Sequence, residues 1–444
     1  MSQGSRVKIV VLDDDPTGIQ TVHGCLMLTA WTPGLVREAL RDKAGFFYIL
    51  TNNRAHLPGE AARRIEEIMN TVLQVNAEYR HRIMFISRSD STLRGHFPLE
   101  TDVMAQVYEK YYGVKIDAVF LVPAFIEGGR ITKDDTHYVR RGNEIIPAAD
   151  TEFARDPVFG FRSSNLKDYI REKSGNRISR QPILSFSLDD LRRTSTRELK
   201  KMIVNITGGP YVVVNAENYR DLRRFSYAVH AALSEGRHFL FRSAASVVRT
   251  LSFLSRRPLV GRECLAASSS PGVVIAGSFV KRSREQLDIL LKDSTVHGIH
   301  IDVNRIPGES DAVVRHALEY VSIARNAGKT PVVYTSSEEK RCSSAKEQLV
   351  FGKSVSKVLC DIAEHLPEKT GYMIVKGGIT AADILTSALK IPQARVLGQL
   401  LPGVPVVHTP DDSRFGRMPY VIFPGNVGMR TSLRRAYRKL LPPF

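Results

Sequence analysis

The stretch VKIVVLDDDPTGIQTVHG, residues 7–24, begins as a β-strand and ends in a cluster of acids. Its strand, Lys8–Leu12, is mostly apolar, which is typical of a buried strand in a parallel sheet. Asp13, Asp14 and Asp15 follow at once, and then come a proline, a threonine and a glycine that are typical of a turn. Because ligands of open α/β sheets bind beyond the carboxyl ends of the strands, this stretch predicts a functional site at the strand tip.

Strand-length apolar runs alternate with amphipathic helical patterns through the first half of the chain. Further strands are predicted at Phe46–Thr51, Ile83–Ser87, Ala118–Val122, Tyr211–Asn215 and His238–Phe241. Helices are predicted over Pro58–Tyr79, Pro98–Tyr112 and Asn218–Gly236. This alternation favours a mostly parallel sheet covered by helices.

The segment SRRPLVGRECLAASSSPG, residues 255–272, interrupts this pattern with prolines, glycines and a serine run. It predicts a linker over residues 256–271 between an N-terminal domain, residues 1–255, and a C-terminal domain, residues 272–444. In the second domain strands are predicted at Gly272–Ser278, Gly298–Val303, Thr330–Ser336 and Gly371–Gly378, and the last region is predicted as glycine- and proline-rich loops. We therefore expect two α/β domains, each a largely parallel sheet flanked by helices, with the active site in the cleft between them.

The composition narrows the classes of partner. The formal net charge of +17 would suit nucleic acid, but the basic residues are spread along the chain. Their densest clusters, residues 191–201 and 430–439, resemble helix faces without interleaved aromatics, so we expect no nucleic-acid partner. No run approaches the roughly 18 apolar residues that a membrane span needs, so we expect no membrane partner. A protein that handles small anions is the better interpretation.

The start of the chain and its cysteines predict a cytoplasmic location. A few polar residues lead directly into the first strand, so no signal peptide is visible. The cysteines lie far apart with no CxxC pair, which argues against a disulfide framework or a zinc site and fits a reducing compartment. They are Cys25, Cys264, Cys342 and Cys360.

Charged side chains follow four strands of the first half at the point where each strand ends. The positions are Asp13, Asp14, Asp15, Arg54, Arg88, Asp90, Ser91, Thr92, Arg94, Glu127 and Arg130. Arginines pair bidentately with carboxylates, aspartates accept hydrogen bonds from hydroxyls, and one aspartate is a candidate general base. Each position alone is also explained by a turn, a cap or a surface ion pair. Their repetition at successive strand ends favours a small acidic, hydroxylated ligand.

The strand ends of the second half are rich in glycine instead. The loops are AGS at 276–278, KGGIT at 376–380 and PGNVG at 424–428. Glycine lets backbone N–H groups approach phosphate oxygens, and Thr380 is predicted to cap the helix that follows. Neither a Walker loop nor a GxGxxG fingerprint is present, but three such loops in one domain predict binding of nucleotide phosphates.

Together these motifs resemble the four-carbon acid sugar kinase family, which includes the threonate, erythronate and 3-oxo-tetronate kinases. The motifs that carry the resemblance are LDDDPTG, SRSDSTLRGH, PAFIEGGR, TEFARDP, AGS, KGGIT, PGVP and FPGNVG, in that order. The resemblance implies a kinase that uses ATP with Mg²⁺, whose N-terminal domain binds a sugar acid and whose C-terminal domain binds the nucleotide. Departures at Pro16 and Ile379, where members often have leucine and an acid, leave the exact substrate open.

The resemblance also implies roles for individual residues, with no metal ligand assigned. Asp14 and Asp15 are the candidate catalytic acids, while Asp13 is expected to be structural. The implied substrate-binding residues are Arg54, Asp90, Ser91, Thr92, Arg94 and Arg130, and the implied nucleotide-binding residues are Ser278, Gly377, Gly378, Thr380, Gly425 and Asn426. Our hypothesis is that Arg94 and Arg54 hold the substrate carboxylate while Asp14 or Asp15 deprotonates the terminal hydroxyl.

Two other classes of function remain open at this stage. One is a non-catalytic protein of the same fold that binds a sugar acid and a nucleotide, which the retained Asp and Arg residues disfavour. The other is an NAD-type oxidoreductase, against which the missing GxGxxG after the first strand argues. A homodimer is a candidate assembly for the protein.

Overall fold

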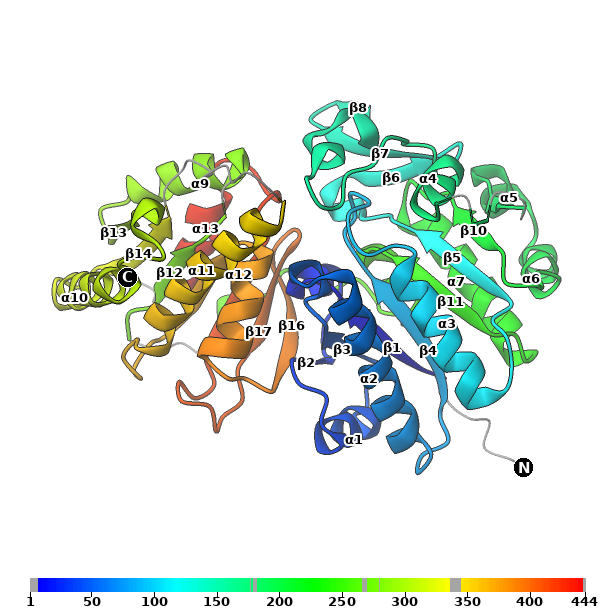
Figure 1. Cartoon of the computed structure of the whole chain (residues 1–444), viewed down its shortest axis with the longest axis horizontal. Coiled ribbons are helices and arrows are strands. Elements are labelled where there is room, and N and C mark those ends of the chain that lie inside the picture. The colour runs from blue at the N-terminus through cyan, green and yellow to red at the C-terminus, as the bar shows by residue number, and fades with distance from the viewer. Residues whose placement is uncertain are drawn as a thin grey trace. The chain divides into compact units, whose positions relative to one another are not determined.

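The computed structural model describes residues 7–175, 177–178, 182–265, 270–278, 280–335 and 345–441. The chain divides into two units, Met1–Arg256 and Arg257–Phe444 (Figure 1). Cys342, residues 266–269 of the predicted linker, and Ser336 at the end of one predicted strand lie outside the described residues.

The N-terminal unit is built on a parallel sheet with the strand order β2-β3-β1-β4-β11-β5-β10-β9. Strand β1 lies in the interior of this sheet between β3 and β4 and is almost wholly buried, as its continuous apolar run predicts. The bounds are β1 Val7–Asp13, β2 Leu26–Leu28, β3 Phe46–Leu50, β4 Arg82–Arg88, β5 Ala118–Val122, β9 Leu184–Phe186, β10 Tyr211–Val214 and β11 Phe239–Ser243.

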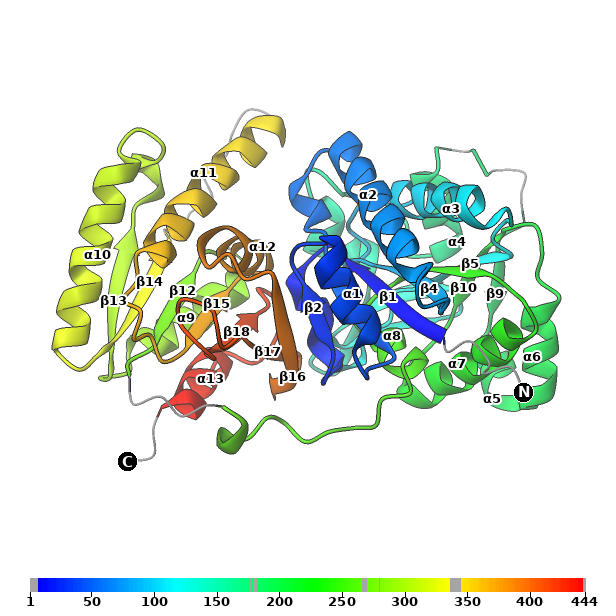
Figure 2. The same ribbon diagram turned by 90° about the horizontal axis from the view of Figure 1, so that it is seen from below.

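Helices cover both faces of this sheet, with α2 and α3 on one face and α7 and α8 on the other (Figure 2). The helices are α1 Pro33–Arg41, α2 Pro58–Asn76, α3 Leu99–Tyr112, α4 Leu166–Lys173, α5 Leu188–Arg193, α6 Thr196–Val204, α7 Tyr219–Ser234 and α8 Ala245–Leu251. The three predicted helices are found close to their predicted bounds. Proline begins α2, where its missing N–H costs nothing, and Gly113 with φ of 70° ends α3 in the left-handed region.

A small antiparallel sheet, β6-β7-β8, also belongs to this unit and was not predicted from the sequence. Its strands are β6 Arg130–Lys133, β7 Thr136–Arg141 and β8 Glu144–Pro147. The first hairpin turns at Asp134 and Asp135, both with positive φ, where glycine or asparagine is the usual signal. The sheet begins directly at Arg130, one of the predicted substrate-binding residues.

The C-terminal unit has the strand order β13-β14-β12-β15-β18-β17-β16. Strands β13, β14, β12, β15 and β18 are parallel to one another. Strand β17 pairs antiparallel with β18, and β16 pairs antiparallel with β17. The bounds are β12 Val273–Ala276, β13 Val296–Ile301, β14 Thr330–Thr335, β15 Met373–Lys376, β16 Gln393–Leu401, β17 Val404–His408 and β18 Pro419–Phe423. The prediction of loops in the last region is wrong, because β16, β17 and β18 lie there. Burial alternates along β16, so this strand has no continuous run of apolar residues. A proline lies within β17 and another begins β18, and proline argues against a strand in a sequence-based prediction.

Helices flank this second sheet as well, with α11 on one side and α13 on the other (Figure 2). They are α9 Lys281–Leu291, α10 Ser310–Asn326, α11 Ala345–Glu364, α12 Gly378–Asp383 and α13 Ser432–Leu440. Part of the predicted linker packs on this unit, since Val260 is buried and its N–H donates to the Gln399 carbonyl over 2.8 Å. Within the described ranges, no helix has the length and apolar character needed to cross a membrane.

Candidate active site

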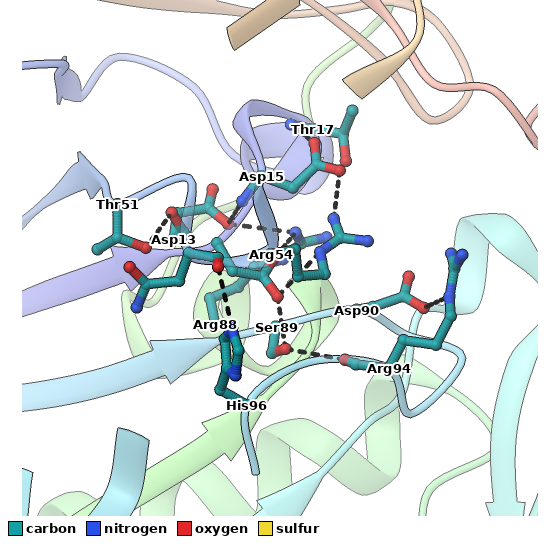
Figure 3. Close-up of polar contacts among 12 residues, drawn as sticks. Asp13, Asp15, Thr17, Thr51, Arg54, Arg88, Ser89, Asp90, Arg94 and His96 are labelled. Atoms are coloured by element: carbon teal, nitrogen blue, oxygen red, sulfur yellow. Dashed lines mark hydrogen bonds and ion pairs between the residues drawn. The ribbon is translucent and has the colours of Figure 1, made fainter. Parts of the chain in front are cut away.

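Four of the charged motifs meet at one edge of the N-terminal sheet. Strands β3, β1, β4 and β5 are parallel, so their carboxyl ends point the same way and bring together the residues that follow each strand. Figure 3 shows the resulting network of aspartates and arginines. We call its innermost part the acid–arginine cluster, made of Asp13, Asp14, Asp15, Arg54 and Arg88.

Asp13 is the most deeply buried acid of this cluster. It is 1% exposed, and its Oδ1 accepts hydrogen bonds from Arg88 Nη1 over 3.1 Å and from the backbone N–H of Asp15 over 3.4 Å. Burial raises the pKa of Asp13 well above its usual value, against the opposing effect of Arg88. A Cβ on Gly18 would lie 2.0 Å from Asp13 Oδ2, so only glycine leaves room for this carboxylate under the 3-10 helix η1, Pro16–Thr21. Asp13 therefore has a structural role.

Arg54 bridges the two candidate catalytic acids. Its Nε lies 3.1 Å from Asp14 Oδ2, and its Nη2 pairs with Asp15 Oδ2 (Figure 3). Asp14 also accepts a hydrogen bond from Ser89 Oγ over 2.6 Å, and Asp15 Oδ1 accepts one from the N–H of Thr17 over 2.8 Å. The side chain of Asp14 is 1% exposed and that of Asp15 is 12% exposed. Asp15 is thus the more exposed of the two acids.

Arg94 is paired with carboxylates in the same region. Its Nε lies 2.8 Å from Asp90 Oδ2, its Nη1 lies 3.4 Å from Asp156 Oδ2, and its guanidinium lies over the ring of Phe153. Burial acts to raise the pKa of Asp90, but the charges of Arg94 and Arg54 bring it below its usual value. Both arginines that we expected to hold the substrate carboxylate are therefore engaged by aspartates of the protein itself.

Buried side chains hold the loop that carries Asp90, and one of them, Arg242, should have been found from the strand-end pattern. Arg242 is 1% exposed and donates hydrogen bonds over 3.1 Å to the carbonyls of Asp90 and Arg94. It follows a predicted strand, as the other site residues do, and we did not include it. Thr92 is wholly buried and donates to Asp90, and the Ser91 carbonyl contacts His137 Nε2 over 2.8 Å. These contacts shape the loop.

Glu100 supports the acid–arginine cluster from the interior. It is 5% exposed and accepts hydrogen bonds of 2.7 Å from Asn53 Nδ2 and from Ser87 Oγ. Asn53 precedes Arg54, and Ser87 precedes Arg88 in the chain. Burial, with a further contribution from the charge of Asp14, raises the pKa of Glu100 to about 7. No sequence signal marked Glu100, because it lies at the start of an amphipathic helix rather than after a strand.

The three glycine loops of the C-terminal unit lie against one another. A Cβ on Gly425 would lie 2.9 Å from Ser278 Oγ, and one on Gly277 would lie 2.5 Å from Thr380 Oγ1. Gly377 has φ of 121°, and its added Cβ would lie 3.4 Å from Ser278 Cβ. Only glycine permits these close approaches, so the side chains of Ser278 and Thr380 lie directly against the backbones of the loops. Gly378 and Asn426 are the chain neighbours of Gly377 and Gly425.

The prediction that Thr380 caps the following helix is wrong. Helix α12 begins at Gly378, so the N-cap position belongs to Gly377, and Thr380 lies inside the first turn. With its positive φ, Gly377 is the N-cap, so the helix starts three residues earlier than it would with Thr380 as the cap.

Two residues that we did not predict tie the glycine loops together. Lys376 is wholly buried; its Nζ donates to the Gly425 carbonyl over 3.2 Å and to the Pro424 carbonyl. Burial lowers the pKa of Lys376 well below its usual value. Ser283 Oγ contacts Ser278 Oγ over 2.9 Å and the Gly425 carbonyl over 3.0 Å. Lys376 precedes the paired glycines of KGGIT, so the motif itself contained this signal.

Comparison with known protein families agrees with the division of the chain. A model described as a sugar-binding N-terminal domain matches residues 9–251, and one described as a nucleotide-binding C-terminal domain matches residues 273–433. The chain belongs to the four-carbon acid sugar kinase family. The charged sheet edge lies within the first match, and the glycine loops lie within the second.

Two kinases of this family resemble the chain in sequence. The D-threonate kinase of Salmonella typhimurium is 22% identical over 444 residues, covering 96% of this chain and 97% of that enzyme. The D-erythronate kinase of Heliobacterium modesticaldum is 28% identical over 230 residues, and the match covers 50% of this chain and 48% of that enzyme. The chain therefore spans about half of the second relative and nearly all of the first.

Solved structures share the fold. A Salmonella typhimurium protein described as a putative tRNA synthase superposes with a TM-score of 0.69 at 17% identity, covering 97% of this chain and 99% of that chain. A Haemophilus influenzae protein superposes with a TM-score of 0.62 at 16% identity, covering 97% of this chain and 100% of that chain. At this level of identity the likeness shows the fold alone.

Replacing Gly18 by alanine should disrupt the acid–arginine cluster. The added methyl would overlap Asp13 Oδ2, so we expect a loss of about 1–3 kcal/mol in the free energy of unfolding, measured by urea denaturation. Gly59→Ala in α2 is the matched control, since a Cβ there meets nothing within 4 Å and no loss is expected. Equal stability of Gly18→Ala and the parent would contradict the role given to Gly18.

Glu100→Gln should change how stability depends on pH. The folded pKa of about 7 lies above the usual 4.5, so the folded parent holds a proton that the unfolded chain releases. The parent should therefore lose stability relative to the Gln variant as pH rises from about 4.5 to 7. Urea unfolding of both proteins across this range measures the difference, and a difference that stays constant with pH would count against a buried, protonated Glu100.

Proposed function

We propose that the protein transfers the γ-phosphate of ATP to the terminal hydroxyl of a four-carbon sugar acid such as threonate, erythronate or 3-oxo-tetronate. The observation that carries this proposal is the gathering of paired aspartates and arginines at one edge of the sugar-binding sheet. The kinase names of the two relatives and the glycine loops of the nucleotide-binding unit support it. A cytoplasmic location and a homodimer stay predictions.

Asp15 is the candidate general base in this proposal. It is the more exposed of the two acids, and both of its oxygens are oriented, one by the Thr17 N–H and one by Arg54. Asp15 would accept the proton of the terminal hydroxyl while the oxygen of that hydroxyl attacks the γ-phosphorus in line. The bond between the γ-phosphorus and the oxygen that bridges the β- and γ-phosphates would break, and ADP would leave. Asp14, held by Ser89 and Arg54, keeps Arg54 in the position from which it orients Asp15.

The glycine loops would bind the phosphates of ATP through backbone N–H groups and the hydroxyls of Ser278 and Thr380. Mg²⁺ bound with ATP takes one or two protein carboxylates and neutralises phosphate charge. Asp14 fits such an ion, because its Oδ1 is buried and accepts no hydrogen bond from any residue in the described ranges. Asp14 is therefore a residue that would hold the metal, with Arg88 Nη1 3.7 Å from the same oxygen.

A coupled assay of ADP release tests this function. We expect activity with ATP and at least one acid among threonate, erythronate and their oxo derivatives. Asp15→Asn should lower turnover by at least about a hundredfold, as loss of a general base does. Asp168→Asn is the control, since that acid of the same unit is 61% exposed and its ion pair among the described residues is with its helix neighbour Arg171.

Two outcomes would count against the proposal. Near-normal turnover in both Asp14→Asn and Asp15→Asn would remove the base assignment. Failure of every acid to release ADP from a protein that binds ATP would remove the proposed substrate class.

A further inference from the structure

Arg130 is a buried cation whose surroundings differ from those of the other arginines. Its residue is 5% exposed, and its Nη1 donates to the Gly128 carbonyl. Its guanidinium carbon lies 5.9 Å from the centroid of the Phe125 ring, and its Nε has no hydrogen-bond partner within the described ranges. A guanidinium carries five N–H donors in a fixed fork, so Arg130 keeps donors that a ligand can use.

Three other arginines at this sheet edge are paired with aspartates of the protein itself, whereas Arg242 has no ion pair among the described residues but donates to two backbone carbonyls of the loop after β4. Arg54 pairs with two aspartates of the acid–arginine cluster, Arg88 pairs with Asp13, and Arg94 pairs with Asp90 and Asp156. Among the ion pairs of the described residues, none includes Arg130. Burying a charge without a counter-ion is costly, and burial lowers the pKa of Arg130 to about 10. Arg130 is thus a buried cation that has no carboxylate partner among the described residues, and a ligand can supply one.

The local sequence is built to place this guanidinium. In the motif IEGGR a Cβ on Gly128 would lie 2.4 Å from Arg130 Nη1. Gly129 has φ of 72°, and a Cβ on it would lie 2.8 Å from Arg140 Cβ. Gly128 therefore leaves room for the Arg130 side chain to fold back over its own loop, and Gly129 lets this loop lie against β7. The charges of Asp90 and Arg94 act on Arg130, which puts it within electrostatic reach of the loop after β4.

We propose that Arg130 is the residue that binds the carboxylate of the sugar acid. This inference rests on the proposed function and deepens it, because it names the group that selects acids over neutral polyols. A carboxylate would accept two parallel hydrogen bonds from the guanidinium fork and satisfy its unpartnered N–H groups. Arg54 and Arg94, to which we first gave this role, act as counter-ions that hold the aspartates in place.

The experiment compares the acid with its own neutral amide, which differs from it in charge and little in shape. Isothermal titration of the full chain measures the affinity of both ligands for the parent, Arg130→Gln and Arg130→Lys. We expect Arg130→Gln to bind the acid about 30-fold or more weakly than the parent, because the carboxylate loses a buried charged partner. The affinity of the variant for the amide should equal that of the parent. The Michaelis constant for ATP should not change. Arg162→Gln is the control, because that side chain is 91% exposed.

The outcomes separate this inference from the proposed function. If Arg130→Gln keeps the parent's preference for acid over amide, the anchor role is overturned even if ADP release is normal. If the acid binds the parent but is not phosphorylated, loss of that binding in Arg130→Gln still supports the anchor and only the kinase proposal fails. If no four-carbon acid binds the parent, both fail. Should Arg130→Gln not fold, Arg130→Lys decides: it keeps the charge but not the fork, so unweakened acid binding would overturn the inference.

Discussion

The neutralisation of three consecutive aspartates by two arginines, Arg88 and Arg54, is the interaction on which the rest of this site depends. Strand β1 is almost wholly buried, so its tip delivers Asp13, Asp14 and Asp15 into a place where uncompensated charge is costly. Arg88 from β4 and Arg54 from the loop after β3 meet these acids. These ion pairs join the carboxyl ends of three parallel strands, and Asp15 is the most exposed of the three acids.

Neutralisation inside the cluster explains why a neighbouring arginine is left without a counter-ion. Arg54, Arg88 and Arg94 are each used by aspartates of the protein, whereas Arg130 is placed by two glycines and given only a carbonyl and an aromatic ring. One set of arginines therefore orients the acids that act on a hydroxyl, and the other is available to a carboxylate. A ligand with both groups, such as a short sugar acid, matches this division.

The sequence was sufficient for the parallel sheet of the N-terminal unit, apart from the short edge strands β2 and β9, and for the gathering of the motifs at one edge. Continuous apolar runs mark β1, β3, β4 and β5, and parallel strands necessarily place their ends together. It was not sufficient where neighbours in space decide the outcome. Arg54 is paired with acids from a different strand end, and Arg94 contacts Asp156 from a distant loop besides its neighbour Asp90. Glu100 becomes a buried acid only when α3 packs behind the cluster.

Local signals failed for different reasons in the C-terminal unit. Strands β16–β18 are half-buried or contain proline, so they lack the continuous apolar run that marks a central parallel strand. Thr380 matched the residue type of a helix cap, but the left-handed freedom of Gly377 starts α12 earlier. Lys376 was hidden inside a motif that drew attention to its glycines, although its buried ammonium joins two of the loops.

The most direct test of this account is a crystal structure of the full chain with the acid that gives the fastest ADP release and a non-hydrolysable ATP analogue. The account predicts the carboxylate of the acid on the guanidinium of Arg130, its terminal hydroxyl within hydrogen-bond distance of Asp15, and Arg54 still between Asp14 and Asp15. A carboxylate bound by Arg54 or Arg94, with either arginine released from its aspartates and Asp15 out of reach of every hydroxyl, would contradict it.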